Sequence, residues 1–309
     1  MEGYSFLVVD QEHRQAFIDA WETAFNRSLS HHVYDWIFDD NNKIYAFVEE
    51  NKVIAGYCLY PLEAIVDGRY ATVLLCNNVF VDPGRQGRNL FVLLGKQALH
   101  HAAVNEYGSV AIGIPNRLAL PGHKRVGWNV QPPIYFLEKY RPTASRVDGI
   151  TWLDGRLPEL VKDEIEKCSL KASQGRGLSI IKTKKFLTWR FDSKPGVNYR
   201  YGLVKEGTSV VAYCVCKYYE QDRVLHFIDI DGYDPASIIR LILSAEALPY
   251  EFQRLNVWDT TTFSDQFREV GYNKVDRKDN LIIKMLHSDA CGQNDLSKIN
   301  LVLADNDVY

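Results

Sequence analysis

The stretch that decides the fold is residues 81–91, Val81-Asp82-Pro83-Gly84-Arg85-Gln86-Gly87-Arg88-Asn89-Leu90-Phe91. A β-rich run, residues 69–81, leads into it, and Asp82-Pro83-Gly84 ends that strand. The apolar residues of the next stretch, 90–104, recur at helical spacing. The segment therefore joins a strand to a helix. Its last amides are the unpaired donors of a helix N-terminus, which bind phosphate without needing a charged side chain.

The side chains of this loop also suit an anion. Gly84 and Gly87 carry no Cβ, so a phosphate can approach the backbone there. Arg85 and Arg88 add positive charge for the distal phosphates. A basic loop with glycines also occurs as an ordinary solvated connection, so the order of the surrounding elements has to decide between the two interpretations.

The first half of the chain alternates strands and helices. The expected strands are residues 5–9, 43–49, 53–61, 69–81 and 109–114, and the expected helices are 11–25, 31–38 and 90–104. The Asn51-Lys52 step predicts a hairpin between the second and third strands. This order predicts an α/β fold with a mixed sheet, in which one long strand feeds a helix through the phosphate-binding loop.

The second half repeats the same order with different residues. Its expected strands are 197–205, 209–219, 224–230, 254–259 and 280–285, and its expected helices are 235–246 and 263–270. Each half closes a short helix with a glycine and an aromatic residue, Gly127-Trp128 and Gly271-Tyr272. We infer an internal duplication with little residue identity. Two unrelated α+β domains that share this order by chance are the alternative.

Composition at the centre of the chain suggests where the domains meet. Residues 141–178 are rich in charge and glycine around one amphipathic helix. The expected division is therefore a first domain at 1–140, a linker with a helix at 141–178, a second domain at 179–290 and a C-terminal tail at 291–309.

The loop resembles the acyl-coenzyme A motif of the GNAT superfamily, Gln/Arg-x-x-Gly-x-Gly/Ala. Gln86 falls on its first position, Asn89 on the central glycine and Phe91 on the last small residue. Asn89 can adopt the left-handed conformation that the motif's glycine adopts, whereas Phe91 is bulkier than its counterpart. The resemblance implies two GNAT-like domains, each a twisted mixed sheet flanked by helices, and a donor site for acetyl-CoA. It implies donor contacts from residues of this loop: Arg85, Gln86, Gly87, Arg88, Asn89, Leu90 and Phe91.

A second motif of the superfamily follows the next expected strand. Asn116, Ala119, His123, Gly127 and Trp128 stand at the offsets 0, +3, +7, +11 and +12 of that motif. The resemblance implies that Asn116 contacts the pantetheine arm of the donor. It also implies that His123, at the usual tyrosine position, protonates the departing thiolate. An imidazolium group can supply that proton, although a histidine between Gly122 and Lys124 is equally typical of a protein surface.

The remaining catalytic parts are less complete. By resemblance, the amide of Phe80 or Val81 would hold the thioester carbonyl and stabilise the oxyanion. Many relatives carry a glutamate base on the strand before the loop, but residues 72–81 contain no acid, and Asn77 and Asn78 stand there instead. The base could come from Glu63, from the second domain or from solvent.

Candidate acceptor residues are few. His31 and His32 lie in the helical region that usually caps the acceptor mouth of this superfamily. Solvent-facing histidines at a helix start are the simpler interpretation. The stretch Leu187–Phe191 resembles tandem GNAT-like acetyltransferases of bacterial polysaccharide and amino-sugar pathways, which suggests an amino-sugar acceptor.

The second half lacks the features of a donor site. Its corresponding loop, 229–235, contains three aspartates and no arginine, so it would repel a diphosphate. At the offset of His123 it has Phe267. We therefore expect a degenerate, non-catalytic second domain.

Composition excludes several other classes of function. The net charge of −3 and the pI near 6.3 give no basic field for nucleic acid or anionic membranes. Cys214 and Cys216 share one strand face, but no second ligand pair follows at zinc spacing, so no metal is expected. No apolar run reaches the length of a membrane helix, and the N-terminus does not read as a signal peptide, so we expect a cytoplasmic protein. A homodimer is an open possibility.

The leading hypothesis is an enzyme that passes an acetyl or short acyl group from coenzyme A directly to a primary amine of a small molecule. Transfer to a hydroxyl is the nearest alternative, because His123 could act as a base. A protein that binds acyl-CoA, or scaffolds a partner, without turnover is the alternative from another class.

Overall fold

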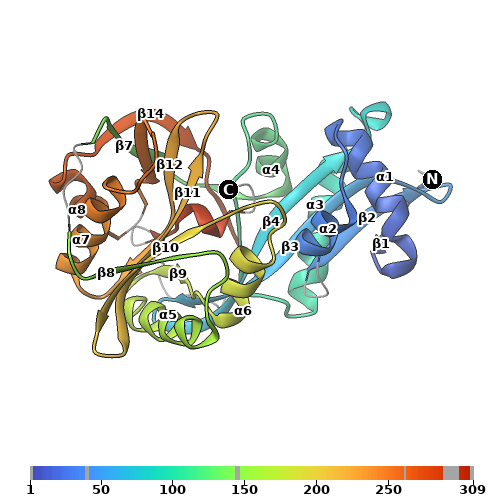
Figure 1. Ribbon diagram of the computed structural model, residues 1–309. Helices are drawn as coiled ribbons and strands as arrows, with labels where there is room; N and C mark the ends of the chain where they lie inside the picture. The colour runs from blue at the N-terminus through green and yellow to red at the C-terminus, as the bar shows by residue number, and fades with distance from the viewer. Residues whose placement is uncertain (1–2, 39–41, 143–146, 261, 288–298, 307–309) are drawn as a thin grey trace. The chain divides into compact units, whose positions relative to one another are not determined.

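The computed structural model describes residues 3–38, 42–142, 147–260, 262–287 and 299–306. It divides into two compact units (Figure 1). Within the described residues, no helix is long and apolar enough to cross a membrane. Those residues also contain no cluster of three or more His, Cys, Asp or Glu side chains that could hold a metal ion. Five cysteines are free and buried, and Cys291 lies outside the described residues.

The first unit consists of residues 1–62, 71–133 and 279–292. Its helices are α1 (Arg14–Phe25), α2 (His31–Ile37), α3 (Leu90–Val104) and α4 (Leu120–Val126), with 3-10 turns at Gln11–His13 and Pro83–Arg85. Its strands are β1 (Ser5–Val8), β2 (Lys43–Glu49), β3 (Lys52–Val66), β4 (Arg69–Val81), β5 (Val110–Gly113), β6 (Asn129–Val130) and β15 (Ile282–Met285).

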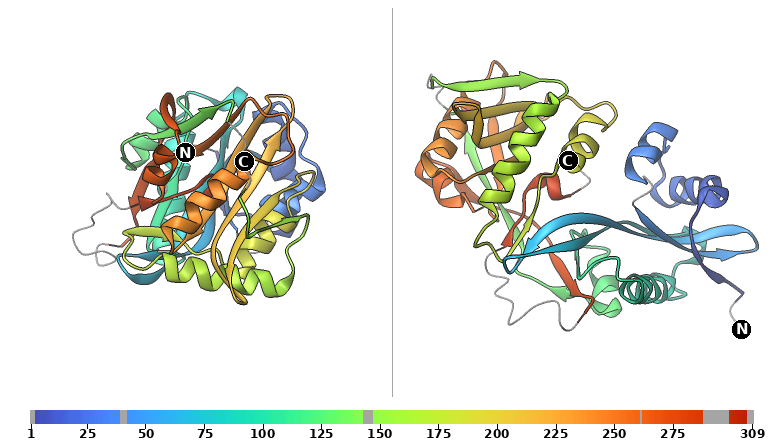
Figure 2. Two further views of the ribbon diagram at one scale, coloured as in Figure 1. Left: turned by 60° about the vertical axis from the view of Figure 1, so that its left-hand side comes forward. Right: turned by 90° about the horizontal axis from the view of Figure 1, so that it is seen from below.

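These strands form one mixed sheet in the order β1-β2-β3-β4-β5-β15-β6. β4 and β5 run parallel, and the pairs β1–β2 and β2–β3 are antiparallel. Helix α3 covers one face of this sheet, and α1 and α2 cover the other (Figure 2). The expected mixed α/β architecture is confirmed.

The second unit consists of residues 63–70, 134–278 and 293–309. Its helices are α5 (Glu159–Ala172), α6 (Lys184–Leu187), α7 (Pro235–Glu246) and α8 (Ser264–Glu269), with a π-helical turn at Thr188–Asp192 and a 3-10 turn at Leu303–Asp305. Its strands are β7 (Ile134–Tyr140), β8 (Ile150–Asp154), β9 (Leu178–Ile180), β10 (Arg200–Glu206), β11 (Ser209–Tyr219), β12 (Val224–Gly232), β13 (Arg254–Trp258), β14 (Asn273–Asp279) and β16 (Ile299–Asn300).

The main sheet of this unit, read from its other edge, has the order β8-β10-β11-β12-β13-β7-β14, which corresponds to the first sheet position by position. β12 and β13 run parallel, as β4 and β5 do. Short strands β9 and β16 pair with each other, and β9 also pairs with the end of β3. The matching strand orders support the inferred duplication, because chance would rarely give seven equivalent positions twice.

The two units exchange a strand. β15 lies late in the sequence, yet it inserts between β5 and β6 of the first sheet, antiparallel to both. Reciprocally, β7 follows β6 in the sequence but pairs with β13 in the second sheet. The expected boundaries at 140 and 179–290 therefore differ from the units of the structure, because an apolar strand pattern does not reveal which sheet the strand joins.

Residues 141–178, expected as a linker, belong to the second unit. Their strand β8 pairs with β10, and their helix α5 packs on β11 and β12. Of the expected tail, residues 299–306 are described and fold into the second unit, whereas 291–298 and 307–309 lie outside the described residues.

Candidate functional site

The first sheet opens at the carboxyl end of β4. Pairing between β4 and β5 runs from Val73 and Val110 to Cys76 and Gly113. Beyond this point β4 continues to Val81, whereas β5 ends. A parallel pair that separates in this way leaves backbone donors on the inner edge of the longer strand.

The side of β4 to which successive backbone N–H and C=O groups point does not alternate regularly along the whole strand. The carbonyl of Thr72 accepts from the Ser109 amide at 3.0 Å, so Thr72 faces β5. The amide of Asp82 donates to the Ile54 carbonyl at 2.9 Å, so Asp82 faces β3. In a regular strand these two residues would face the same side. One irregular residue must lie between them, and Asn78, with φ 46°, marks the bulge.

The bulge decides which amides face the opening. Counting back from Asp82, the N–H groups of Val79 and Val81 point away from β3, and the N–H of Phe80 points toward it. The Phe80 ring is buried over Gly56 and packs edge-on against Phe17 at 5.3 Å. Of the two residues expected to offer an oxyanion donor, the geometry therefore favours Val81 over Phe80.

The loop after β4 presents further amides. Gly87 has φ 84°, and Asn89 has φ 62°, the left-handed conformation expected of it. Asn89 begins α3 without a side-chain cap, although its carbonyl accepts from the amides of Val92 and Leu93. The amides of Leu90 and Phe91 have no hydrogen-bond partner within the described residues. A helix N-terminus with free amides is an anion-binding element.

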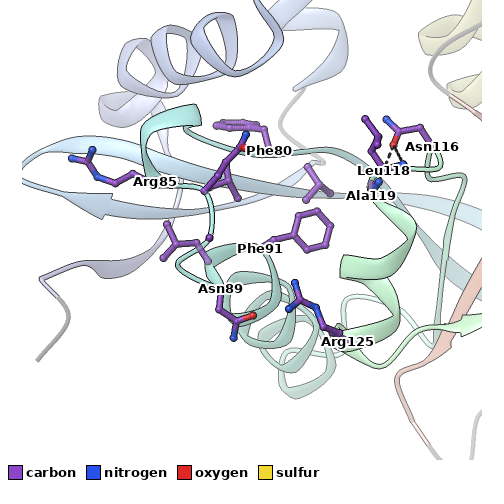
Figure 3. A pocket seen from close by; sticks show the side chains of 13 residues that line it. Phe80, Arg85, Asn89, Phe91, Asn116, Leu118, Ala119 and Arg125 are labelled. Carbon is purple, nitrogen blue, oxygen red and sulfur yellow. Dashed lines mark hydrogen bonds between the residues drawn. The ribbon is translucent and has the colours of Figure 1, made fainter.

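These features line one cavity of about 590 Å³ (Figure 3). All of the residues expected to contact the donor, except Arg88, line this cavity. It also has four lining residues that the sequence did not single out as donor contacts: Val79, Leu118, Ala119 and Arg125.

The two arginines of the loop are engaged elsewhere. The Arg85 guanidinium donates to the Glu49 carboxylate at 2.7 Å, with a second contact at 2.6 Å, and Arg88 approaches the same carboxylate at 3.6 Å. Glu49 raises the pKa of Arg85 through this hydrogen bond and its charge. Figure 3 shows the Arg85 side chain directed away from the other labelled residues. One carboxylate thus offsets much of the positive charge that the sequence offers to phosphates.

Asn116 begins the turn that leads into α4. Its Oδ1 accepts from the amides of Leu118 and Ala119 at 3.0 and 2.9 Å (Figure 3). The residue therefore caps the turn with its carbonyl oxygen, and its side chain still lines the cavity.

His123 does not line the cavity. Its side chain is buried against the rings of Phe91 and Trp128, with ring centroids 4.9 and 5.7 Å away, and its Nδ1 has no hydrogen-bond partner in the described structure. Burial lowers the pKa of His123 to about 4. The imidazole is therefore neutral near pH 7, and the geometry does not support the expected role as the acid that protonates the thiolate.

The Phe91 ring lies between the cavity and His123. It fits there because a Cβ on Gly122 would lie only 2.7 Å from the ring. The bulky residue at a position where the motif has a small one is thus accommodated by a glycine on α4. Sequence reasoning noticed Phe91 but had no signal that pairs it with Gly122.

Comparisons with known proteins agree with this geometry. Residues 8–131 match the family model described as an acetyltransferase (GNAT) domain. Over these residues the chain is similar to a GNAT acetyltransferase domain. A comparison with curated protein sequences gives no match.

Solved structures resemble the chain over 92% of its length. They include a GCN5-related N-acetyltransferase from Anabaena variabilis, with a TM-score of 0.74 and 11% identity over 73% of its chain. A probable N-acyltransferase from Enterococcus faecalis has a TM-score of 0.71 and 11% identity over 72%. The Saccharomyces cerevisiae N-myristoyltransferase with bound myristoyl-CoA has a TM-score of 0.62 and 10% identity over 83%. At these identities the likeness establishes the fold.

Other residues expected near the chemistry of the GNAT domain lie outside its cavity. His31 and His32 are exposed at the start of α2. The Glu63 side chain is exposed on β3. Among the described residues that line the cavity, none is acidic. Asn77 is buried with its Oδ1 unpaired, and the Asn78 Oδ1 accepts from the indole of Trp21 at 3.0 Å. No base is assigned by this geometry.

The second unit fills the place that corresponds to the opening of the first sheet. Pairing of β12 and β13 ends at His226 and Asn256, and β12 continues to Gly232. The C-terminal turn Leu303–Asp305 packs on β12. The buried ammonium of Lys182 pairs with the buried Asp305 carboxylate, which fixes this segment. The turn Leu303–Asp305 thus packs at the opening of the second repeat.

Proposed function

We propose that this protein transfers an acetyl or short acyl group from acyl-CoA to a primary amine of a small molecule. The observation that carries the proposal is the cavity in which the opened edge of β4 meets the free amides of the loop before α3. A diphosphate would take the amides of Leu90 and Phe91. The extended pantetheine arm would lie along β4, as an added strand lies on a sheet edge.

In this mechanism the amine attacks the thioester carbonyl carbon while both substrates are bound. The carbon–nitrogen bond forms, negative charge develops on the carbonyl oxygen, and the Val81 amide donates to it. The carbon–sulfur bond then breaks, and the sulfur leaves as a thiolate. The nitrogen loses one proton and the thiolate gains one. Because no acidic residue or exposed histidine lines the cavity in the described part of the chain, we assign this exchange to solvent.

The second repeat has a structural role in this proposal. Its opening is closed by residues 299–306, and Phe267 is fully buried at the position equivalent to His123. We therefore propose a single donor site per chain, in the first unit.

The proposed acceptor class is a small amine, with amino sugars as the first candidates to test. The stretch that suggested amino sugars, Leu187–Phe191, has an internal function. Its Arg190 is fully buried and donates to the carbonyls of Ala304 and Asn306 at 3.0 Å. This stretch holds the C-terminal segment, so the acceptor class rests on the resemblance alone.

The test is titration calorimetry with acetyl-CoA, on the wild type and on Gly87→Trp. A Cβ on Gly87 meets no atom within 4 Å and its φ is 84°, so a large side chain there obstructs the loop and strains it. Gly155→Trp is the matched control, because Gly155 has φ 79°, equally open surroundings and a place in the other unit. We expect one bound acetyl-CoA per chain for wild type and control, and none for Gly87→Trp. Absence of binding by the wild type refutes the donor site.

An acyl-CoA-binding protein without turnover is the second candidate, and the absence of a catalytic acid or base among the described lining residues favours it. Hydroxyl transfer is a third possibility, which the burial of His123 makes less favourable. Release of free thiol from acetyl-CoA, measured with matched amine and hydroxyl acceptors, separates the three. Thiol release with amines alone supports the proposal, and binding without thiol release supports the second candidate.

A further inference from the structure

We propose that Arg125 on α4, rather than Arg85 or Arg88 of the loop, is the side chain that contacts the diphosphate of the acyl-CoA donor. The inference rests on the proposed donor site and names a binding residue that the motif does not include. It follows from where each guanidinium lies and from which carboxylates surround it.

Position favours Arg125. It lines the same cavity as Gly87, Asn89 and Leu90, although it comes from a different element. Figure 3 shows its side chain extending from α4 toward the start of α3. An anion held at the amides of that helix start would therefore have Arg125 on its other side. Arg88, in contrast, does not line the cavity.

Electrostatics favours Arg125 as well. Arg85 and Arg88 both approach the Glu49 carboxylate, which is only partly exposed and accepts at 2.7 Å from Arg85. To bind a phosphate they would have to leave that carboxylate or share it. The Arg125 guanidinium has no hydrogen bond or ion pair within the described residues. Its positive charge is therefore fully available to an incoming anion.

The chemistry of the group suits the ligand. A guanidinium presents a planar set of N–H donors that matches phosphate oxygens in pairs, which an ammonium group cannot reproduce. The loop amides then hold one side of the diphosphate through dipoles, and Arg125 supplies the formal charge on the other. This division explains how the site can take a dianionic group although the two arginines of the loop both approach Glu49.

The test compares Arg125→Gln, Arg125→Lys and Lys124→Gln by titration with acetyl-CoA. Lys124→Gln is the control because it removes the same charge from the same helix. Lys124 is exposed and does not line the cavity. We expect Arg125→Gln to weaken binding by about tenfold, as for loss of a charge-assisted hydrogen bond. Arg125→Lys should lose part of that affinity, and Lys124→Gln should weaken binding less than about twofold. Arg85→Gln should lose less affinity for acetyl-CoA than Arg125→Gln.

A second donor distinguishes the phosphates. With 3′-dephospho-CoA, the same fold loss on Arg125→Gln supports contact with the diphosphate. A loss seen only with the 3′-phosphorylated donor overturns this assignment and places the contact at the 3′-phosphate. Equal affinity of Arg125→Gln and wild type for both donors overturns the proposal while leaving the donor site intact. Failure of the wild type to bind would instead refute the proposed function. Arg125 is exposed and has no partner among the described residues, so unchanged thermal unfolding should accompany its substitution.

Discussion

Replacing His123 by phenylalanine tests whether this histidine is a buried packing residue or a catalytic acid. Phenylalanine keeps an aromatic ring against Phe91 and Trp128 and removes the unpaired Nδ1. We expect the variant to keep its acyl-transfer or acyl-CoA-binding activity. If His123 were the catalytic acid, this substitution would abolish acyl transfer, because a phenylalanine ring has no proton to donate.

The same variant should change how stability depends on pH. Burial lowers the pKa of His123 from 6.5 to about 4, so between these values the unfolded chain binds a proton that the folded chain does not. The wild type therefore loses stability as the pH falls through this window. At about pH 5 the loss relative to about pH 7.5 amounts to about 2 kcal/mol from this residue. The variant should lack this loss of stability.

Urea unfolding of both proteins at the two pH values measures the difference. Any cost of fitting the larger ring is independent of pH and cancels. Asp229, whose pKa burial raises to about 7, shifts stability with the opposite sign, but it is common to both proteins and cancels too. Equal pH dependence in wild type and variant would show that His123 is accessible to protons. Loss of all thiol release at unchanged acetyl-CoA affinity would restore its catalytic role.

Two further changes test packing that the structure alone reveals. Gly122→Val adds a side chain whose Cβ would lie only 2.7 Å from the Phe91 ring, so the ring should move into the cavity and weaken acetyl-CoA binding several-fold. Adding Phe91→Ala should recover affinity, and an additive loss in the double variant would contradict this explanation. Asp305→Asn leaves the buried Lys182 without its carboxylate and should cost about 3–5 kcal/mol of unfolding free energy. Glu251→Gln removes a carboxylate from an exposed pair, so its unfolding free energy should stay within about 0.5 kcal/mol of the wild type. Similar unfolding midpoints for the two variants would refute the stabilising role of the segment that contains Asp305.

Local patterns predicted most of the elements. Helices α3 and α7 and strands β4 and β11 lie where periodicity placed them, because each combines a regular apolar pattern with a clear stop signal. The expected strand 280–285 is also present, as β15. The sequence assigned it to the second domain, because the pairing partners of a strand lie far away in the chain and leave no local trace.

Two of the strands that the sequence did not predict, β7 and β14, have a common cause. β7 and β14 pair with each other, and their sequences, Ile134–Tyr140 and Asn273–Asp279, alternate poorly or are largely charged. β14 in particular is exposed along much of its length, so hydrophobic periodicity cannot detect it. Its place in the sheet depends on pairing with β7.

Within the site, the sequence located the loop, and the structure shows how its side chains are placed. The motif indicated correctly that Asn89 turns left-handed. It could not reveal that Glu49, far away in the sequence, occupies Arg85. Nor could it reveal that Arg125 lines the cavity without a partner in the described part of the chain.

The sequence by itself determined the fold class, the repeated order of elements and the strand-to-helix loop, because these depend on periodicity, turn residues and a motif of fixed spacing. The tertiary structure decided the exchange of β7 and β15, the orientation of the Val81 amide through the bulge at Asn78, and the burial of His123 behind Phe91. Each of these depends on which distant segments meet in space. Pairing, packing and pKa are set by such neighbours, and a linear pattern does not contain them.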